Sequence, residues 1–237
     1  MKTNKINLWA SPRNISTAIM YSFAQRKDTI VIDEPFYAAY LKSTGIIHPG
    51  QDEILASQNQ KFNAVLKEVI QRTYPSENVF FKQMSHHLLS HPKDFLLDCK
   101  NIILIREPKE MIISFSKVID SPKLNDLGIK QSYEIFQYLI DKGQSPIVID
   151  SNELLKNPKK VLSLVCEKLA IPFDEKMLQW KAGKRPEDGV WSPHWYNNVH
   201  QSTGFSPYQK RKEVLEERFE DLYQECLFYY EKIKEKA

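Results

Sequence analysis

Residues 6–17 of this chain read INLWASPRNIST and lead into a helix that we expect over residues 15–26. The apolar start of this stretch is typical of a buried strand. A loop between a buried strand and a helix N-terminus is where open α/β sheets bind phosphate, because unpaired N–H groups and the helix dipole face the anion. The hydroxyls of Ser16 and Thr17 and the permanent charge of Arg13 would strengthen such a site. The alternative is an ordinary strand-to-helix turn with polar caps.

Further apolar, β-branched runs follow the first one, at residues 29–32, 78–81, 101–105 and 145–149. Amphipathic stretches that predict helices lie between them, at residues 15–26, 51–73, 93–97, 109–118 and 129–142. This alternation predicts an α/β fold, a parallel β-sheet flanked by helices on both faces. We expect a single domain over residues 1–237, with a core at about residues 5–170 and a helical and aromatic part at about residues 171–237.

The second half of the chain carries helix-start signals. Residues 150–153 resemble a capping box, Asn157-Pro158 an N-cap with proline at the first helical position, and Ser206-Pro207 the same pattern. A final amphipathic helix is predicted by an apolar stripe that steps by four and three, formed by Leu215, Phe219, Leu222, Cys226, Tyr229 and Ile233. Between these signals, residues 183–205 predict an ordered aromatic loop near a binding site. Its aromatic residues, with Phe36 and Tyr37, suggest either apolar pocket walls or core.

The composition narrows the classes of ligand. The chain has 33 basic and 30 acidic side chains, a net charge of +3, which is too weak for a nucleic-acid-binding face and leaves a small anionic ligand open. Seven glycines, none before Gly45, exclude the Gly-Lys triphosphate loop at the N-terminus. Cys99, Cys166 and Cys226 form no C-x-x-C pair and suit a reducing cytoplasm. We expect no signal peptide, no membrane span and no metal site.

A second anion-binding candidate follows the strand at residues 101–105. Arg106 stands at the carboxyl end of that strand, where ligands collect in such folds, and Ser114 lies two turns along the next helix. Taken alone, an arginine followed by acidic residues is usually a surface ion pair.

Together, these two segments resemble the sulfotransferases that use 3'-phosphoadenylyl sulfate. In that family the loop after the first strand grips the 5'-phosphosulfate, and an arginine with a serine eight positions later holds the 3'-phosphate. The resemblance implies a P-loop-nucleotide-hydrolase-like sulfotransferase fold, metal-free transfer of a sulfuryl group to a hydroxyl or amine of a small-molecule acceptor, and adenosine 3',5'-bisphosphate as the product. This chain differs by having Asn14-Ile15 where Ser-Gly is common. The residues implied to bind the sulfuryl donor are Arg13, Asn14, Ile15, Ser16, Thr17, Arg106 and Ser114.

The same resemblance implies candidates for acid–base chemistry. Several branches of the family use a glutamate just after the second strand, which favours Glu34 as the base; the alternative is that Asp33 and Glu34 cap a helix beginning at Pro35. Lys82 matches the lysine that lies near the transferring group. His86 is a further candidate base, although it follows Lys82 by four positions where many cytosolic sulfotransferases have two.

Two other functions remain open at this point. A P-loop small-molecule kinase or nucleotide hydrolase using Mg-ATP would explain an apolar strand that ends in Asp33 and Glu34, but the first loop lacks the phosphate-binding lysine. A nucleotide-binding protein of the same fold without turnover is the third possibility. The basic cluster at residues 210–212 loosely resembles the family's loop at the 3'-phosphate, while a charged surface helix is the simpler interpretation.

Overall fold

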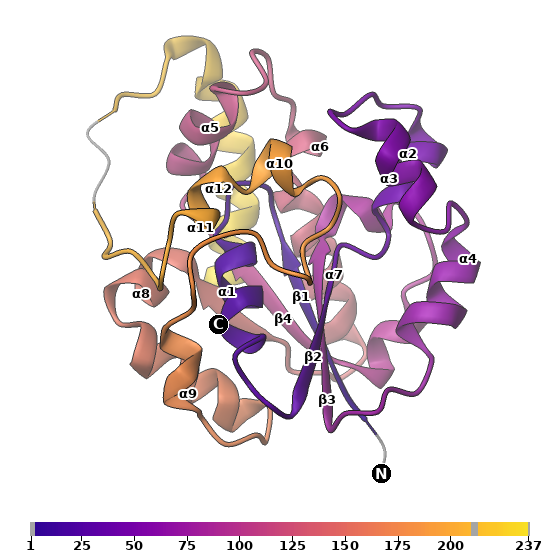
Figure 1. The fold of residues 1–237 in the computed structure, drawn as a ribbon. Helices are drawn as coiled ribbons and strands as arrows, with labels where there is room; N and C mark the ends of the chain where they lie inside the picture. The colour runs from indigo at the N-terminus through magenta and orange to yellow at the C-terminus, as the bar shows by residue number, and fades with distance from the viewer. Residues whose placement is uncertain (1–2, 210–212, 237) are drawn as a thin grey trace.

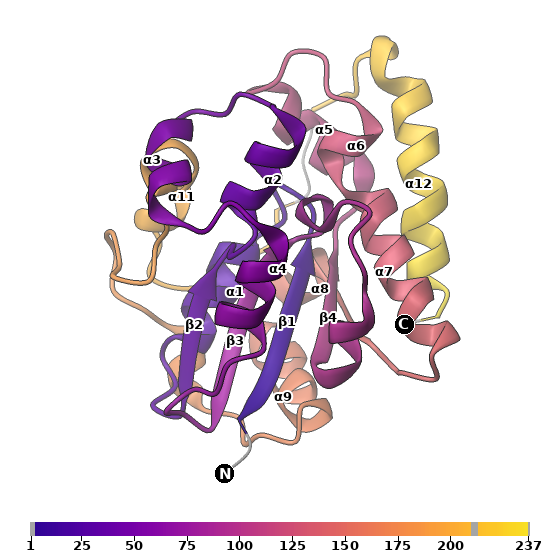
Figure 2. The ribbon, with the colours of Figure 1, turned by 90° about the vertical axis from the view of Figure 1, so that its right-hand side faces the viewer.

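The structure is a computed structural model that describes residues 3–209 and 213–236. Within these residues, five parallel strands form the central sheet, in the order β2-β3-β1-β4-β5 (Figure 1). They are β1 Asn4–Ala10, β2 Thr29–Asp33, β3 Asn78–Met84, β4 Lys100–Ile105 and β5 Ile147–Asp150. The strands expected from the sequence are therefore confirmed. Because all of them run in one direction, their carboxyl ends meet at one edge of the sheet, the upper edge in Figures 1 and 2.

Helices cover both faces of the sheet. The α-helices are α1 Ser16–Phe23, α2 Tyr37–Thr44, α3 Gln51–Ser57, α4 Phe62–Val65, α5 Pro108–Ser116, α6 Leu124–Leu127, α7 Ile129–Asp141, α8 Ser151–Lys156, α9 Pro158–Lys168, α10 Ser192–Trp195, α11 Asn197–His200 and α12 Glu220–Lys234. A π-helical turn, η1 Leu66–Ile70, and four 3-10 turns complete them, η2 Ser85–Leu88, η3 Asp94–Asp98, η4 Glu175–Leu178 and η5 Glu217–Phe219.

The strands alternate their side chains between two apolar clusters, as a pleated strand must. Trp9 and Phe81 lie in the cluster packed by α7 and α12, which Figure 2 shows side by side along the sheet. Leu8 and Phe80 lie in the opposite cluster, packed by α1 and α9. Both faces of the sheet are thus buried, which explains why the strands are apolar almost without interruption.

Several expected elements differ in their extent. The helix expected over residues 51–73 breaks at Gln58, whose backbone is extended and whose side chain bonds Ala38 N and Glu34 O near the end of β2. The segment at residues 93–97 is a 3-10 turn instead of an α-helix. Tertiary hydrogen bonds at Gln58 outweigh the local helical pattern there.

The expected caps are confirmed at two of three positions. The carboxylate of Asp150 accepts from the first backbone N–H groups of α8, and Asn157 caps α9 with Pro158 at its start. At Ser206-Pro207 the expectation is wrong, since the described residues 206–209 form no helix. The final helix begins only at η5 and α12, and Tyr230 replaces Tyr229 as the buried member of its stripe.

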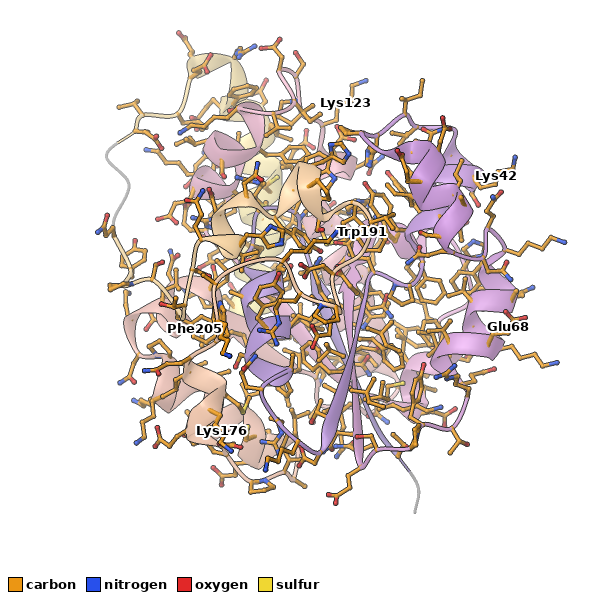
Figure 3. All side chains as sticks on the ribbon, viewed as in Figure 1. Lys42, Glu68, Lys123, Lys176, Trp191 and Phe205 are labelled. Atoms are coloured by element: carbon orange, nitrogen blue, oxygen red, sulfur yellow. The ribbon has the colours of Figure 1, made fainter. Side chains whose placement is uncertain are left out.

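A third apolar cluster lies above the carboxyl edge, where α2 and α3 meet the loop that carries α10. In Figure 3, Trp191 lies between α10 and α2, whereas Lys42, Glu68 and Lys176 point away from the body. No helix in the described part of the chain is long and apolar enough to cross a membrane.

Candidate functional site

A cavity of about 630 Å³ opens at the carboxyl edge of the sheet. All of the site residues proposed from the sequence line it, namely Arg13, Asn14, Ile15, Ser16, Thr17, Glu34, Lys82, His86, Arg106 and Ser114. Segments that are far apart in the chain therefore meet at one place, as ligand sites do in open parallel sheets.

The first loop reaches the cavity through an unusual backbone. Ile15, at the N-cap of α1, has φ 44°, and Arg13 has φ 61°, both in the left-handed region that glycine tolerates best. Asn14 is buried between them, and its Nδ2 donates to Leu104 O on β4 at 2.8 Å. This anchor fixes the loop without a glycine. It also explains why the expected helix begins at Ser16, one residue later than its apolar pattern suggested.

Alanine is usually more stabilising than glycine, but at position 15 we expect the opposite. The free energy of unfolding of the Ile15→Gly variant should be about 1 kcal/mol higher than that of the Ile15→Ala variant, because a left-handed backbone strains any residue that has a Cβ. Ala18→Gly in helix α1 is the matched control and should lose about 0.5–1 kcal/mol. Denaturant unfolding measures both. An alanine variant at position 15 that is as stable as the glycine variant would contradict the strained loop.

The two anion-binding candidates form one connected group. Arg106 Nη1 donates to the carbonyl oxygen of Arg13 at 2.6 Å, and Arg13 Nε donates to Ser114 Oγ at 3.1 Å. Arg106 also pairs with Glu110 at 3.1 Å, and the Tyr208 hydroxyl donates to the other oxygen of that carboxylate at 3.2 Å. The Arg106 side chain is 12% exposed, so this ion pair lies inside the cavity wall instead of on the surface.

A second group joins the ends of β2 and β3. The sheet register places Asp33 beside Lys82, so both side chains point to the same face. Lys82 Nζ donates to Asp33 Oδ1 at 3.0 Å, to Tyr196 OH at 2.6 Å and to Glu34 Oε1. Glu34 has φ 38°, and its N–H donates to Lys82 O at 2.8 Å. The strained backbone of Glu34 is thus held by the neighbouring strand.

Burial and charge act against each other at this second group. Burial raises the pKa of Glu34 and, despite the opposing charge of Lys82, leaves it above its usual value. For Lys82, burial favours the neutral amine, but the carboxylates of Asp33 and Glu34 outweigh it and raise the pKa of the amine. The ammonium is therefore kept charged, and Glu34 is the carboxylate whose proton affinity is raised. A carboxylate in this state is suited to accept a proton.

The interpretation of Asp33 and Glu34 as helix caps is not supported. Helix α2 begins at Tyr37, its N-cap residue Phe36 makes no side-chain cap bond, and the side chain that accepts from its first turn is Gln58, through Ala38 N. Glu34 instead accepts the Tyr37 N–H through its backbone oxygen. Its carboxylate is left to face Lys82.

His86 and His87 are buried in the 3-10 turn η2 beside Glu34. Burial lowers the pKa of His86 to about 3, with His48 adding a smaller effect, and burial also holds the pKa of His87 well below its usual value. Both imidazoles are therefore neutral at physiological pH, and His87 stacks on Tyr37 and Tyr40. Among the described residues, no group of three or more metal-ligating side chains is found.

The aromatic loop supplies site residues to which the sequence assigned no role in the chemistry. Tyr196 and Trp191 are buried, Trp191 Nε1 donates to the Tyr196 hydroxyl at 3.1 Å, and Gly189 N donates to Asp33 Oδ2 at 3.1 Å. The many aromatic residues of this loop predicted that it is ordered. The contact of Tyr196 with Lys82 could not be predicted in this way, because it depends on the tertiary structure. The basic cluster at residues 210–212 lies outside the described residues.

Comparison with known proteins gives consistent matches. A family model described as "Sulfotransferase domain" matches residues 4–237. The branched-chain-amino-acid aminotransferase-like protein 2 of Arabidopsis thaliana is 41% identical over 226 residues, which is 95% of this chain and 40% of that protein. The chain thus spans about two fifths of the length of this curated relative.

Solved structures share the fold. The sulfotransferase domain from the Synechococcus PCC 7002 olefin synthase matches with a TM-score of 0.62 and 19% identity, covering 98% of this chain and 95% of that one. A sulfotransferase from Alicyclobacillus acidocaldarius matches with a TM-score of 0.55 and 11% identity, covering 100% and 97%. At these identities the likeness concerns the fold alone.

Proposed function

Because this chain belongs to the sulfotransferase family, we propose that it transfers a sulfuryl group from 3'-phosphoadenylyl sulfate to a hydroxyl or amine of a small-molecule acceptor. One observation carries the proposal: the cationic group around Arg106 and the pair of Glu34 and Lys82 line the same cavity. The first group suits a polyanionic nucleotide, and the second suits proton transfer beside a developing negative charge.

The residues at the first group fit the nucleotide of the sulfuryl donor. Two guanidinium groups, the hydroxyls of Ser16, Thr17 and Ser114 and the first N–H groups of α1 all offer hydrogen bonds to anionic oxygens. We assign the loop of residues 13–17 to the 5'-phosphosulfate and Arg106 with Ser114 to the 3'-phosphate. These groups need no metal ion to neutralise the phosphates.

Each residue of the second group has a separate role in the proposed reaction. The sulfuryl donor supplies the transferred group and leaves as adenosine 3',5'-bisphosphate. Glu34 accepts the proton of the acceptor hydroxyl as that oxygen forms its bond to sulfur. Lys82 stabilises the negative charge on the phosphate oxygen as the bond from that oxygen to sulfur breaks. His86 is the weaker candidate base, because a group with a pKa near 3 has little affinity for a proton.

The remaining cavity wall includes the carboxylate of Asp126, but its rings and apolar side chains favour an acceptor with an uncharged body. Rings from Tyr37, Tyr40 and Trp195 line this part, and the nearby imidazole of His48 has a pKa lowered by burial. Ile46 and Ile47 line the same cavity, and Ile47 is 84% exposed. We therefore propose neutral alcohols, phenols and amines as the first acceptors to screen with radiolabelled sulfuryl donor.

The proposed setting is the cytoplasm, with no nucleic-acid partner. Cys99, Cys166 and Cys226 are buried and unbridged, and burial raises the pKa of each thiol, which keeps all three unreactive. Buried thiols of this kind agree with a reducing compartment.

Thermal unfolding with nucleotides tests the proposal. Adenosine 3',5'-bisphosphate should raise Tm in the presence of EDTA, because a ligand that binds only the native state stabilises it. ATP with Mg²⁺ should change Tm little. Adenosine 5'-monophosphate is the matched control, because it lacks the 3'-phosphate that Arg106 is proposed to hold. A large shift with Mg-ATP and none with the bisphosphate would instead support a kinase or nucleotide hydrolase.

A further inference from the structure

The ammonium of Lys82 has three oxygen partners, of which Glu34 is the proposed base. The others are Asp33 Oδ1 at 3.0 Å and Tyr196 OH at 2.6 Å. A lysine ammonium has three N–H donors, so these partners occupy all of them. All four side chains are buried, which makes each hydrogen bond in the group costly to lose.

Asp33 and Tyr196 also hold each other. The Tyr196 hydroxyl donates to Asp33 Oδ2 at 2.8 Å, and its oxygen accepts from both Lys82 and Trp191 Nε1. Gly189 N donates to Asp33 Oδ2 as well. The pair therefore remains fixed whatever Glu34 does, because it is bonded to the loop as well as to the lysine.

When Glu34 accepts the proton of an acceptor hydroxyl, its carboxylate becomes neutral. Glu34 then no longer balances the charge of the Lys82 ammonium beside it. A buried ammonium without a counter-ion is strongly unfavourable. Asp33 supplies a second carboxylate, and Tyr196 a second oxygen, that stay with Lys82 after Glu34 has been protonated.

We propose that Asp33 and Tyr196 are positioning residues that keep Lys82 charged and in place while Glu34 takes up the proton of the acceptor. The inference rests on the proposed function and gives the loop of residues 183–205 a part in it, since Tyr196 belongs to that loop. Asp33 and Tyr196 contact neither the acceptor nor the sulfuryl donor in this scheme and act through Lys82.

The proposal makes a specific statement about pH. The titratable groups that face Glu34 are Lys82 on β3, Asp33 on β2, His87 on η2 and Tyr196 on the loop. Tyr37, on α2, also feels its charge. The Tyr196 hydroxyl, whose oxygen lies 3.5 Å from Glu34 Oε1, lowers the pKa of Glu34, whereas the charge of Asp33 raises it. Removing these two groups therefore moves the pKa of Glu34 in opposite directions.

The experiment compares Tyr196→Phe and Asp33→Asn with the wild-type chain, using the best acceptor from the screen. Tyr196→Phe should lower kcat about tenfold, as expected for the loss of a hydrogen bond to a charged group, and move the acid limb of the pH–rate profile to higher pH. Asp33→Asn should lower kcat and move that limb to lower pH. The Kd for adenosine 3',5'-bisphosphate should change less than about twofold in both variants.

Tyr230→Phe is the matched control, since it removes another tyrosine–aspartate hydrogen bond, to Asp150 Oδ2 at 2.7 Å, between residues that do not line the cavity. This control should retain the wild-type kcat and pH profile. The positioning role alone would be overturned if both test variants had the wild-type kcat and pH–rate profile. It would also be overturned if the acid limbs of the two variants moved in the same direction. A wild-type chain without sulfuryl transfer would overturn the proposed function and this inference with it. If one test variant fails to fold, the other still tests the positioning role, through its kcat and the direction in which the acid limb of its pH–rate profile moves.

Discussion

Replacing Glu34 with Gln should lower kcat for sulfuryl transfer by about a hundredfold to ten-thousandfold, the range that a positioned general base contributes. Glutamine keeps the size of the side chain but cannot accept the proton of the acceptor. Lys82 retains Asp33 as counter-ion, so the variant should fold and should bind adenosine 3',5'-bisphosphate with an affinity close to that of the wild type. Steady-state kinetics with labelled sulfuryl donor measures the first effect and calorimetry the second.

The pH dependence of the wild type adds a check. Because the base acts in its ionised form and burial raises the pKa of Glu34, kcat should rise with pH through that elevated pKa. Glu68→Gln, an exposed carboxylate in η1, is the matched control and should change neither kcat nor its pH profile. Turnover that survives in Glu34→Gln would transfer the role of base to another group, with His86 the next to replace.

The second large effect is expected at Arg106. Arg106→Ala should weaken binding of adenosine 3',5'-bisphosphate by about a hundredfold, because it removes charge-assisted hydrogen bonds to the 3'-phosphate. It also removes the bond from Nη1 to Arg13 O, which holds the first loop. Titration calorimetry in EDTA gives the affinity directly.

Matched variants separate the charge of Arg106 from its geometry. Arg106→Lys keeps the charge without the planar fork and should recover only part of the affinity. Arg72→Ala, an exposed arginine stacked on Tyr74 just before β3 begins, should bind as the wild type does. Equal affinities of Arg106→Ala and the wild type for adenosine 3',5'-bisphosphate would show that Arg106 does not bind the 3'-phosphate.

Much of the fold followed from local patterns. The apolar strands were predictable because both faces of a parallel sheet are buried, so the runs are mostly apolar, with few polar residues such as Asn7. The caps at Asp150 and Asn157 were predictable because they act within one turn of their own helix. The cap at Ser206 fails, and the helix expected from residue 51 breaks at Gln58. At Gln58, a partner far along the chain competes with the local pattern.

The site divides in the same way. Arg13 and Arg106 were identifiable because each follows the end of a strand, and parallel strands bring those ends together. Glu34 and Lys82 were identified through the resemblance to sulfotransferases. The sequence by itself therefore determined the parallel sheet, the edge at which the ligands meet, and most of the charged groups there.

Only the tertiary structure decided how those charges are paired. It places Tyr196, 114 residues beyond Lys82, on the amine, joins Arg106 to the carbonyl of Arg13, and keeps Ile15 in a backbone that its own sequence disfavours. The physical reason is that a strand end is set by local apolar pattern, whereas a buried ion pair depends on which side chains share one desolvated space. That space is defined only when the loop of residues 183–205 has packed over the edge of the sheet.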